Sequence, residues 1–354
     1  MLNRLPIGEK GIGRFGVHKL GKKIELITRS ANQQEVYVSI DWNAFANAEY
    51  LEDVHVIIEE RNPEYFTGDK TGTKLLISDL SACWSRGMLR SVYRAVTSLS
   101  SPFNTIDAFR VRFKTNKKEW LTGLLNFEDI KRYALYTGSM EIEGNSITKF
   151  TYHFSPFAAM TGLKPRDFQI TSPVTMLESA RGKENNTRKI DLGKYHVGKI
   201  KIDLMVFDRD SSFRARFIED KRTYGTYLDE NGGIRVFRDG VRIYDYGEQG
   251  NDWLGLDSGR INTPSKNLSN NLVLGAVQLD REFSGDLQEK ANREGFIENA
   301  AYIEFRDAVK YAINYFTSQR NIDKESLRVY LNGGKKEPVK QDVSLIRQKI
   351  AMYI

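Results

Sequence analysis

Residues 233–256 read GIRVFRDGVRIYDYGEQGNDWLGL, and this stretch carries the clearest signal of the fold. The apolar residues in 234–236 and 241–243 predict two short strands. Asp239 and Gly240 lie between them, and an Asp-Gly pair at this place is a strong hairpin signal. The stretch therefore predicts an antiparallel β-hairpin.

Two more strands and a long helix are predicted around the hairpin. The strands cover residues 199–207 and 272–279. The helix runs from about residue 295 to residue 318, because apolar residues recur there at helical spacing and form one face for burial: Ala301, Phe305, Ala308, Ala312 and Phe316. Residues 333–336 (GGKK) predict a linker, and residues 343–352 begin another helical pattern.

The first half of the chain mixes several strands with few helices. A short helix is predicted over residues 14–20, with Gly21 at its end, and a longer helix over residues 84–99, before Pro102. Polar residues 181–188 predict a loop. The fold class is therefore α+β, with a domain boundary near residue 175. Strands are predicted over residues 24–28, 36–40, 54–58, 73–77, 109–113 and 147–154.

Composition narrows the classes of protein without choosing among them. The 354 residues, 40% hydrophobic and 28% charged, suit a soluble globular protein with two domains. No apolar run approaches the roughly 18 residues of a membrane span, and the start lacks the apolar core of a secretory signal. The single cysteine, Cys83, fits a reducing, cytoplasmic setting. The four histidines are scattered, which does not favour a zinc site, and the net charge of +7 permits contact with nucleic acid without requiring it.

A glycine-rich segment near the start has the features of a phosphate cradle. Residues 8–15 read GEKGIGRF. Gly8, Gly11 and Gly13 would let backbone N–H groups turn toward a phosphate, and Lys10 and Arg14 add positive charge. A helix that begins just after the loop would direct its positive end to the same place. The Walker pattern is absent, and a flexible turn before a helix explains these residues equally well.

Two shorter motifs follow along the chain. Gly72-Thr73 opens a predicted strand and on its own indicates nothing about function. The run ANREGF, residues 291–296, precedes the long helix, so Arg293 is expected at the positive end of that helix. An arginine at this place is explained if it reaches an anion, or if it forms a salt bridge with an acid such as Glu294 or Glu298.

Taken in order, these motifs resemble those of the GHKL ATPases, the superfamily of gyrase B, the large heat-shock chaperone, histidine kinases, MutL and the MORC proteins. The resemblance rests on GEKGIGRF, on IELIT (residues 24–28), on GTKLLI (residues 72–77) and on LGAVQLDREFSGDLQEKANREGFIEN (residues 274–299). Residues 233–256 look like the transducer of a prokaryotic branch of this group. The resemblance implies an incomplete Bergerat-type ATPase α/β sandwich at residues 1–175 and a transducer domain (ribosomal S5 domain 2-like) at residues 176–325. Residues 326–354 would form a linker and the start of a C-terminal helical region.

The same resemblance implies ATP and Mg²⁺ as cofactors and assigns roles to the residues of the motifs. In the lid, Gly8, Gly11 and Gly13 would present N–H groups to the β- and γ-phosphates, and Lys10 and Arg14 would flank them. The residues of the lid that would bind the nucleotide are Gly8, Lys10, Gly11, Ile12, Gly13, Arg14 and Phe15. Thr73 would lie near the hydrogen-bond network on the adenine side. Arg293 would contact the γ-phosphate and link the two domains, so that closure depends on ATP.

Two features of the family are expected to be missing. Complete members carry, upstream of the lid, a helix with a catalytic glutamate and a Mg²⁺-binding asparagine, followed by a D-x-G-x-G motif that binds adenine. Here the lid begins at residue 8, and residues 229–233 (DENGG) superficially match the adenine motif but are interpreted as a turn. We therefore expect no metal ligand, poor nucleotide affinity and little or no ATP hydrolysis by this chain alone. The first sheet should keep an exposed edge or apolar face.

Three functions are compatible with these features. The leading one is an ATP-binding conformational switch that acts on DNA or a protein client, as a homodimer in its full-length form, with DNA repair or defence suggested by analogy. The second is a non-catalytic module for dimerisation or protein interaction. The third is nucleic-acid binding by a basic surface, with candidate groups at Lys114, Lys117, Lys118, Arg181 and Lys183.

Overall fold

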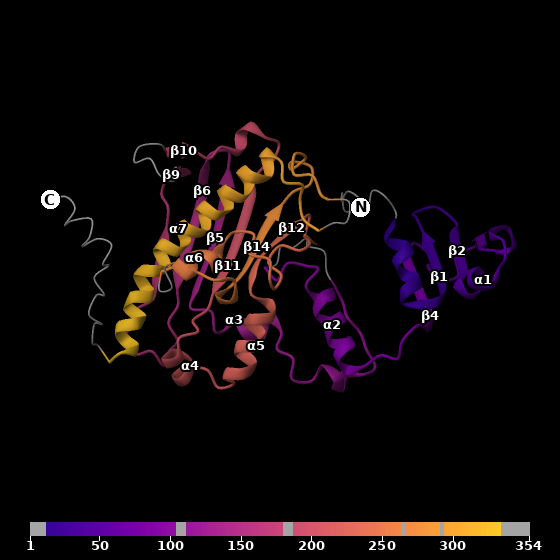
Figure 1. Ribbon diagram of the computed structural model, residues 1–354, viewed down its shortest axis with the longest axis horizontal. Coiled ribbons are helices and arrows are strands. Elements are labelled where there is room, and N and C mark those ends of the chain that lie inside the picture. The colour runs from indigo at the N-terminus through magenta and orange to yellow at the C-terminus, as the bar shows by residue number, and fades with distance from the viewer. Residues whose placement is uncertain (1–11, 104–110, 180–186, 263–265, 291–293, 334–354) are drawn as a thin grey trace. The chain divides into compact units, whose positions relative to one another are not determined.

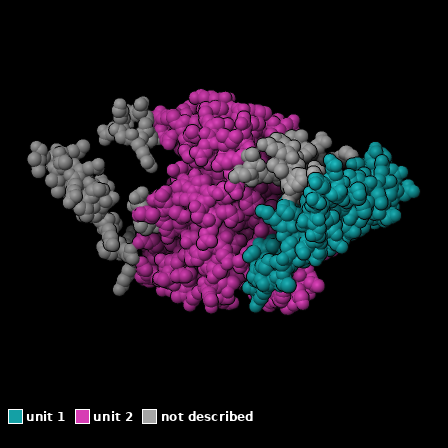
Figure 2. All heavy atoms as spheres, turned by 45° about the vertical axis from the view of Figure 1, so that its right-hand side comes forward, with its two compact units in different colours: residues 1–92 teal, residues 93–354 magenta. Residues whose placement is uncertain are grey.

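The chain divides between Val92 and Tyr93 into two units, residues 1–92 and 93–354 (Figure 2). The computed structural model describes residues 12–103, 111–179, 187–262, 266–290 and 294–333. This division differs from the boundary expected near residue 175, because strands from both sides of that position are hydrogen-bonded in one sheet. Helices and strands occur together along the chain, which agrees with the predicted α+β class.

Unit 1 is built on a four-stranded antiparallel sheet in the order β3-β2-β1-β4 (Figure 1). The four predicted strands are present, although β3 begins later than expected. Gly21 does not end the first helix but begins β1, where a Cβ would lie 2.6 Å from the Ile77 side chain. The elements are η1 (Ile12–Lys19), β1 (Gly21–Arg29), β2 (Glu35–Asp41), α1 (Trp42–Asn47), η2 (Leu51–Asp53), β3 (Ile57–Arg61) and β4 (Gly72–Leu80), and α2 (Arg86–Thr97) crosses the division between the units.

Unit 1 leaves many apolar side chains exposed. Leu26 lies opposite both Val38 and Leu75, and Val38 lies opposite Ile58, so these four residues form a row across one face of the sheet. Leu75 is 44% exposed and Ile58 is 69% exposed. The exposed apolar face that the sequence led us to expect is therefore present. Within the described part of unit 1, the buried hydrophobic residues are Ile24, Ile27 and Leu89.

Unit 2 contains an eight-stranded sheet in the order β13-β12-β14-β11-β5-β6-β7, with β8 paired to β6. The strand β12 runs parallel to β14, and the other pairs are antiparallel. The strands predicted over residues 147–154, 199–207 and 272–279 are confirmed as β6, β11 and β14. The strands are β5 (Tyr136–Glu143), β6 (Ser146–Phe154), β7 (Arg166–Gln169), β8 (Val174–Thr175), β11 (Ile200–Val206), β12 (Gly233–Arg238), β13 (Val241–Ile243) and β14 (Val273–Leu279), and β9 (Leu177–Ser179) and β10 (Thr187–Lys189) form a separate pair.

The predicted hairpin is β12 and β13, and its turn has the expected chemistry. Arg238 pairs with Val241 across the turn. Asp239 and Gly240 have φ angles of 51° and 77°. Positive φ at both central residues is the geometry for which an Asp-Gly pair is preferred, because it matches the twist of the two strands.

The long helix α7 (Ala300–Leu331) covers one face of this sheet (Figure 1). Its predicted apolar face is confirmed, since Ala301, Phe305, Ala308, Ala312 and Phe316 are all buried. At Gly138 in β5 the helix comes so close that an added Cβ would lie 2.6 Å from the Phe316 ring. The helix begins later than predicted, with the Asn299 side chain accepting the Tyr302 N–H as its N-cap, and it continues past residue 318.

Two other predictions in unit 2 were wrong. Residues 111–113 belong to no strand, and Phe113 instead contacts the ring of Tyr93 edge to face. Residues 229–231 form the end of a helix, followed by Gly232 at the C-cap, and not an isolated turn. The remaining helices are η3 (Lys118–Leu121), α3 (Phe127–Lys131), η4 (Leu192–Lys194), α4 (Ser211–Phe217), α5 (Lys221–Asn231), α6 (Leu256–Asn262) and η5 (Asn270–Leu272). Within the described residues, no helix combines the length and the apolar character needed to cross a membrane.

Candidate functional site

The residues predicted to bind phosphate fall mostly at the limits of the described chain. Gly8, Lys10, Gly11 and Arg293 lie outside the described residues. The backbone of Ile12, Gly13, Arg14 and Phe15 forms the first part of η1, a 3-10 helix that takes the place of the helix predicted over residues 14–20. The phosphate cradle itself therefore stays a prediction.

Thr73, predicted to lie on the adenine side of the site, is an exposed residue of β4. Its hydroxyl lies 2.9 Å from the hydroxyl of Thr28, which faces it across the sheet. The Thr28 hydroxyl also donates to the Gly72 carbonyl at 3.3 Å. Thr73 thus has a partner on the neighbouring strand, and its role toward a nucleotide stays a prediction.

The residues that follow Arg293 are held firmly against the hairpin. The backbone of Glu294 forms an isolated β-bridge with that of Tyr244. The backbone of Phe296 forms a second isolated β-bridge with that of Glu289. The Phe296 N–H donates to the Tyr246 hydroxyl at 2.9 Å, and both residues are buried. Gly295 has φ = 86°, and a Cβ there would lie 3.0 Å from the Tyr246 hydroxyl. A glycine is required at this position both by the backbone angle and by the close approach of the ring.

Tyr246 also contacts the start of α7. Its ring is stacked near that of Tyr302 at a centroid distance of 6.2 Å. Burial is the main cause that raises the pKa of Tyr246, so this hydroxyl stays neutral at physiological pH. A single buried side chain therefore joins the hairpin, the segment after Arg293 and the helix.

Two buried arginines of the hairpin fasten the adjoining loops. The Arg238 guanidinium donates to the carbonyls of Ser284 and Leu287 at 2.8 Å and 2.7 Å and forms an ion pair with Glu289 at 3.1 Å. It also lies 4.9 Å from the centre of the Phe296 ring. Burial lowers the pKa of Arg238, while Glu289 opposes that change. The loop between β14 and α7 is therefore tied to β12 by one side chain.

Arg242, the second of these arginines, has no exposed side-chain surface. It forms an ion pair with Glu248 at 2.7 Å and donates to the Tyr246 carbonyl at 3.2 Å and the Ser98 hydroxyl at 3.0 Å. Burial, and after it the like charge of Arg235, lowers the pKa of Arg242 to about 10. The guanidinium is still charged at neutral pH, and it holds the segment from Tyr246 to Glu248 in place.

The helix α7 begins further along the chain than the sequence led us to expect, and not directly after Arg293. The helix begins at Ala300, and the N-cap is Asn299, several residues further along the chain. The reason is that residues 294–296 are bound to Tyr244 and Tyr246 and not to a helix. The dipole of α7 therefore gives no information about a ligand at Arg293.

Sequence reasoning missed Tyr246, Arg238 and Arg242 as parts of this arrangement. The sequence did contain a signal, because the predicted hairpin holds several arginines among its apolar residues. Arginine is rarely buried without a partner, so each of them called for one. Their partners, however, lie far away in the sequence, and the sequence alone does not identify them.

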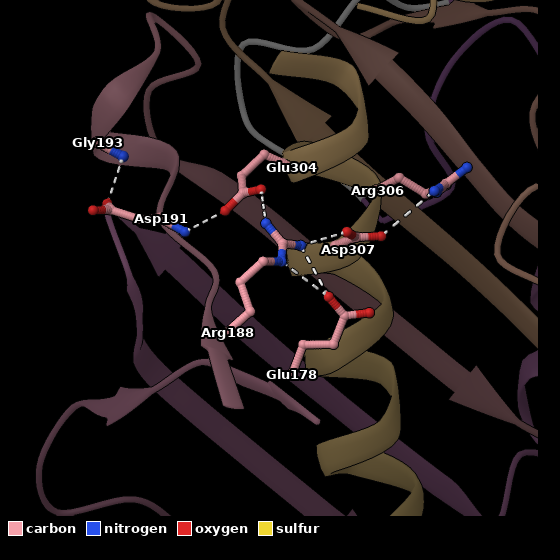
Figure 3. A network of polar contacts seen from close by, with 7 residues as sticks. All are labelled: Glu178, Arg188, Asp191, Gly193, Glu304, Arg306 and Asp307. Atoms are coloured by element: carbon pink, nitrogen blue, oxygen red, sulfur yellow. Dashed lines mark hydrogen bonds and ion pairs between the residues drawn. The ribbon is translucent and has the colours of Figure 1, made fainter. Parts of the chain in front are cut away.

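A second polar network joins α7 to β9 and β10 (Figure 3). Arg188 donates to the carboxylates of Glu178, Asp307 and Glu304 at 2.9 Å, 2.7 Å and 2.5 Å. Glu304 also accepts the backbone N–H of Asp191 at 2.6 Å. Burial raises the pKa of Asp307, and the neighbouring Glu178 adds to this effect. Each carboxylate has a partner, so the network is best explained as a structural tie.

No group of three or more His, Cys, Asp or Glu residues in the described ranges is placed to hold a metal ion. The expected Mg²⁺ thus has no assigned ligand. No protein-family model matches this sequence, and no curated protein is similar to it. The GHKL resemblance therefore stays a prediction, and what the structure itself shows is a chain of mixed α and β elements in two units.

Proposed function

We propose that this chain is an ATP-binding conformational switch of the GHKL type, in which unit 2 transmits the state of the nucleotide. ATP with Mg²⁺ would be the cofactor, and the γ-phosphate would be contacted by Arg293, as the resemblance implies. A homodimer in the full-length form and a DNA or protein client belong to the same proposal.

The observation that carries the proposal is the attachment of the segment after Arg293. Glu294 is paired with Tyr244, the Phe296 N–H is bound by Tyr246, and Asn299 caps α7. A side chain that binds a ligand can influence the rest of a protein only if its backbone is mechanically connected. Here the connections lead to the hairpin and to the longest helix within a few residues.

The physical requirement for switching is a difference in binding between two arrangements. A ligand shifts a conformational equilibrium only by its differential affinity for the two states. A contact made by Arg293 with the γ-phosphate would exist with ATP and not with ADP. It would therefore favour one arrangement of residues 294–299 in the triphosphate state.

The test is nucleotide binding together with local hydrogen exchange. The chain is titrated with Mg²⁺ and a non-hydrolysable ATP analogue, and amide exchange is followed in residues 244–248 and 294–299. We expect binding that slows exchange in these two segments and that is weakened at least tenfold by Arg293→Ala. Arg328→Ala is the control, since Arg328 is a partly exposed residue of α7 that pairs with Glu325 on the same helix.

Two results would contradict the proposal. One is the absence of saturable binding by the analogue. The other is binding that is equally strong in Arg293→Ala and leaves exchange in both segments unchanged.

A further inference from the structure

A cleft of about 450 Å³ opens in unit 2, away from the segment after Arg293. Its walls are the end of α5, the helix α6, the loop of residues 248–250 and the segment that begins η5. The described residues that line it are carboxylates, amides, a serine, glycine backbone and one arginine, with no aliphatic or aromatic side chain among them. Such a lining does not suit an apolar ligand, because polar wall groups would lose water without gaining partners.

The carboxylates of the cleft are already engaged. Asp229 is paired with Arg209, whose Nη2 lies 3.1 Å from one carboxylate oxygen. Glu248 is paired with Arg242, as described above. The third acid, Asp257, accepts the backbone N–H and the side-chain amide of Asn270 at 2.8 Å and 2.9 Å. Because two of the three acids are neutralised by arginines, the walls repel an anion much less than their composition suggests.

Arg260, in contrast, is a half-buried cation that has no anionic partner in the described part of the chain. Its Nη1 donates to the hydroxyl of Ser269 at 3.1 Å, and that hydroxyl in turn donates to the Asn271 side-chain oxygen at 2.7 Å. Ser269 is only 6% exposed, so this wall is fixed. Within the described ranges, no carboxylate lies within ion-pair distance of Arg260. A guanidinium has five N–H donors, so most of its capacity is unused.

A second arginine, whose charge acts on Arg260, also has no anionic partner among the described residues. Arg320 of α7 is 3% exposed, its side chain donates to the Asn321 amide oxygen at 3.3 Å, and its Nε is buried without a hydrogen bond to any described residue. Asp208, one of the two acids whose charge acts on Arg260, is already paired with Lys324. Burial lowers the pKa of Arg260, and the like charge of Arg320 lowers it further. The charges of Asp208 and Asp257 act in the opposite direction and do not cancel this lowering.

We propose that this cleft binds a small oxyanion, a carboxylate or a phosphate, on the guanidinium of Arg260. The planar fork of an arginine matches such oxyanions with two parallel hydrogen bonds, and these charge-assisted bonds are about twice as strong as neutral ones. The volume exceeds that of an inorganic anion, so the natural ligand would be a small polar molecule that carries the oxyanion. Its remaining polar groups would meet the amides of Gln249 and Asn271. The inference does not depend on the proposed ATP site, because none of the residues assigned to that site lines the cleft.

The experiment measures binding of two probes to the whole chain. Inorganic phosphate is followed by its phosphorus NMR line width, and malonate is followed by saturation transfer from the protein to its protons. We expect saturable binding of at least one probe, weakened at least tenfold by Arg260→Gln and less by Arg260→Lys, which keeps the charge but loses the fork. Arg328→Gln is the matched control and should bind as the unchanged chain does.

A second variant protects the test against misfolding. Asn271→Asp places a new negative charge on an exposed position of the same wall, and it should also weaken binding. Binding of phosphate alone would identify a phosphorylated ligand class, and binding of malonate alone a carboxylate. The proposal is overturned if neither probe binds saturably, or if binding is the same in folded Arg260→Gln and Asn271→Asp as in the unchanged chain.

Discussion

Replacing Tyr246 with phenylalanine is the sharpest test of how the segment after Arg293 is held. The change keeps the ring, which packs against Tyr302 and Phe296, and removes only the hydroxyl. The Phe296 N–H then loses its acceptor at a position that is 1% exposed. A buried donor left without a partner costs about 1–3 kcal/mol. We therefore expect the free energy of unfolding to fall by an amount within that range.

Urea unfolding and amide exchange together measure the effect. The unfolding midpoint of Tyr246→Phe should fall by the amount that corresponds to this loss, and exchange should accelerate in residues 294–299. The matched control is Tyr315→Phe, since Tyr315 packs against Phe150 at a ring distance of 4.8 Å and its hydroxyl has no hydrogen bond within the described structure. If both variants unfold at the same urea concentration and exchange alike, the hydroxyl does not hold the segment.

Three further changes test other parts of the fold. Gly138→Ala should destabilise unit 2 by about 1–3 kcal/mol, because its Cβ would lie 2.6 Å from the Phe316 ring. Gly259→Ala is the control and should not destabilise it, because the Cβ there would have a single side-chain neighbour, at 3.6 Å. Urea unfolding compares the two variants. Burial would raise the pKa of Glu35, but hydrogen bonds from the Phe66 and Tyr65 N–H groups and from Arg61 lower it below its unfolded value of 4.5. The stabilisation from Glu35 is therefore present above that value and lost as the pH falls through the lowered pKa, so amide exchange in residues 64–66 should accelerate in acid, and Glu35→Gln should remove this dependence. Ile58→Thr should reduce the binding of an apolar fluorescent dye without lowering stability, because Ile58 is 69% exposed; an unchanged dye signal would show that this face is not accessible.

The sequence predicted those elements whose signals are local. The Asp239-Gly240 turn and the spacing of apolar residues in α7 each depend on neighbours in the chain, and both are confirmed. The start of α7 was misplaced because Tyr246, about fifty positions away, binds the Phe296 N–H and keeps residues 294–296 out of the helix. The boundary near residue 175 failed for a similar reason, since β5 pairs with β11 across it. Pairing between distant segments leaves no trace in local periodicity.

The candidate sites also differ in whether the sequence carried a signal for them. The lid and Arg293 came from a resemblance of motifs, and they lie outside or at the edge of the described residues. The cleft at Arg260 had no sequence signal, because its walls come from α5, α6, η5 and a loop that meet only in the folded chain. A lone arginine in a short helix has no distinguishing neighbour in the sequence. What identifies Arg260 is the absence of a carboxylate partner in the described structure, which is a property of the fold.

Arg238 shows why the hairpin contains buried cations where apolar residues would serve a sheet equally well. Burying a charge is costly, and replacing buried ion pairs with apolar residues of similar size is often neutral or stabilising. An apolar residue at this position, however, would leave the carbonyls of Ser284 and Leu287 without their donor. The arginine therefore fixes the backbone of residues 284–289 more than it adds net stability. It also lies against the ring of Phe296, which follows Arg293 in the sequence. Such a contact is what the proposed switch requires, because a contact at Arg293 can move the helix only if residues 294–299 do not yield.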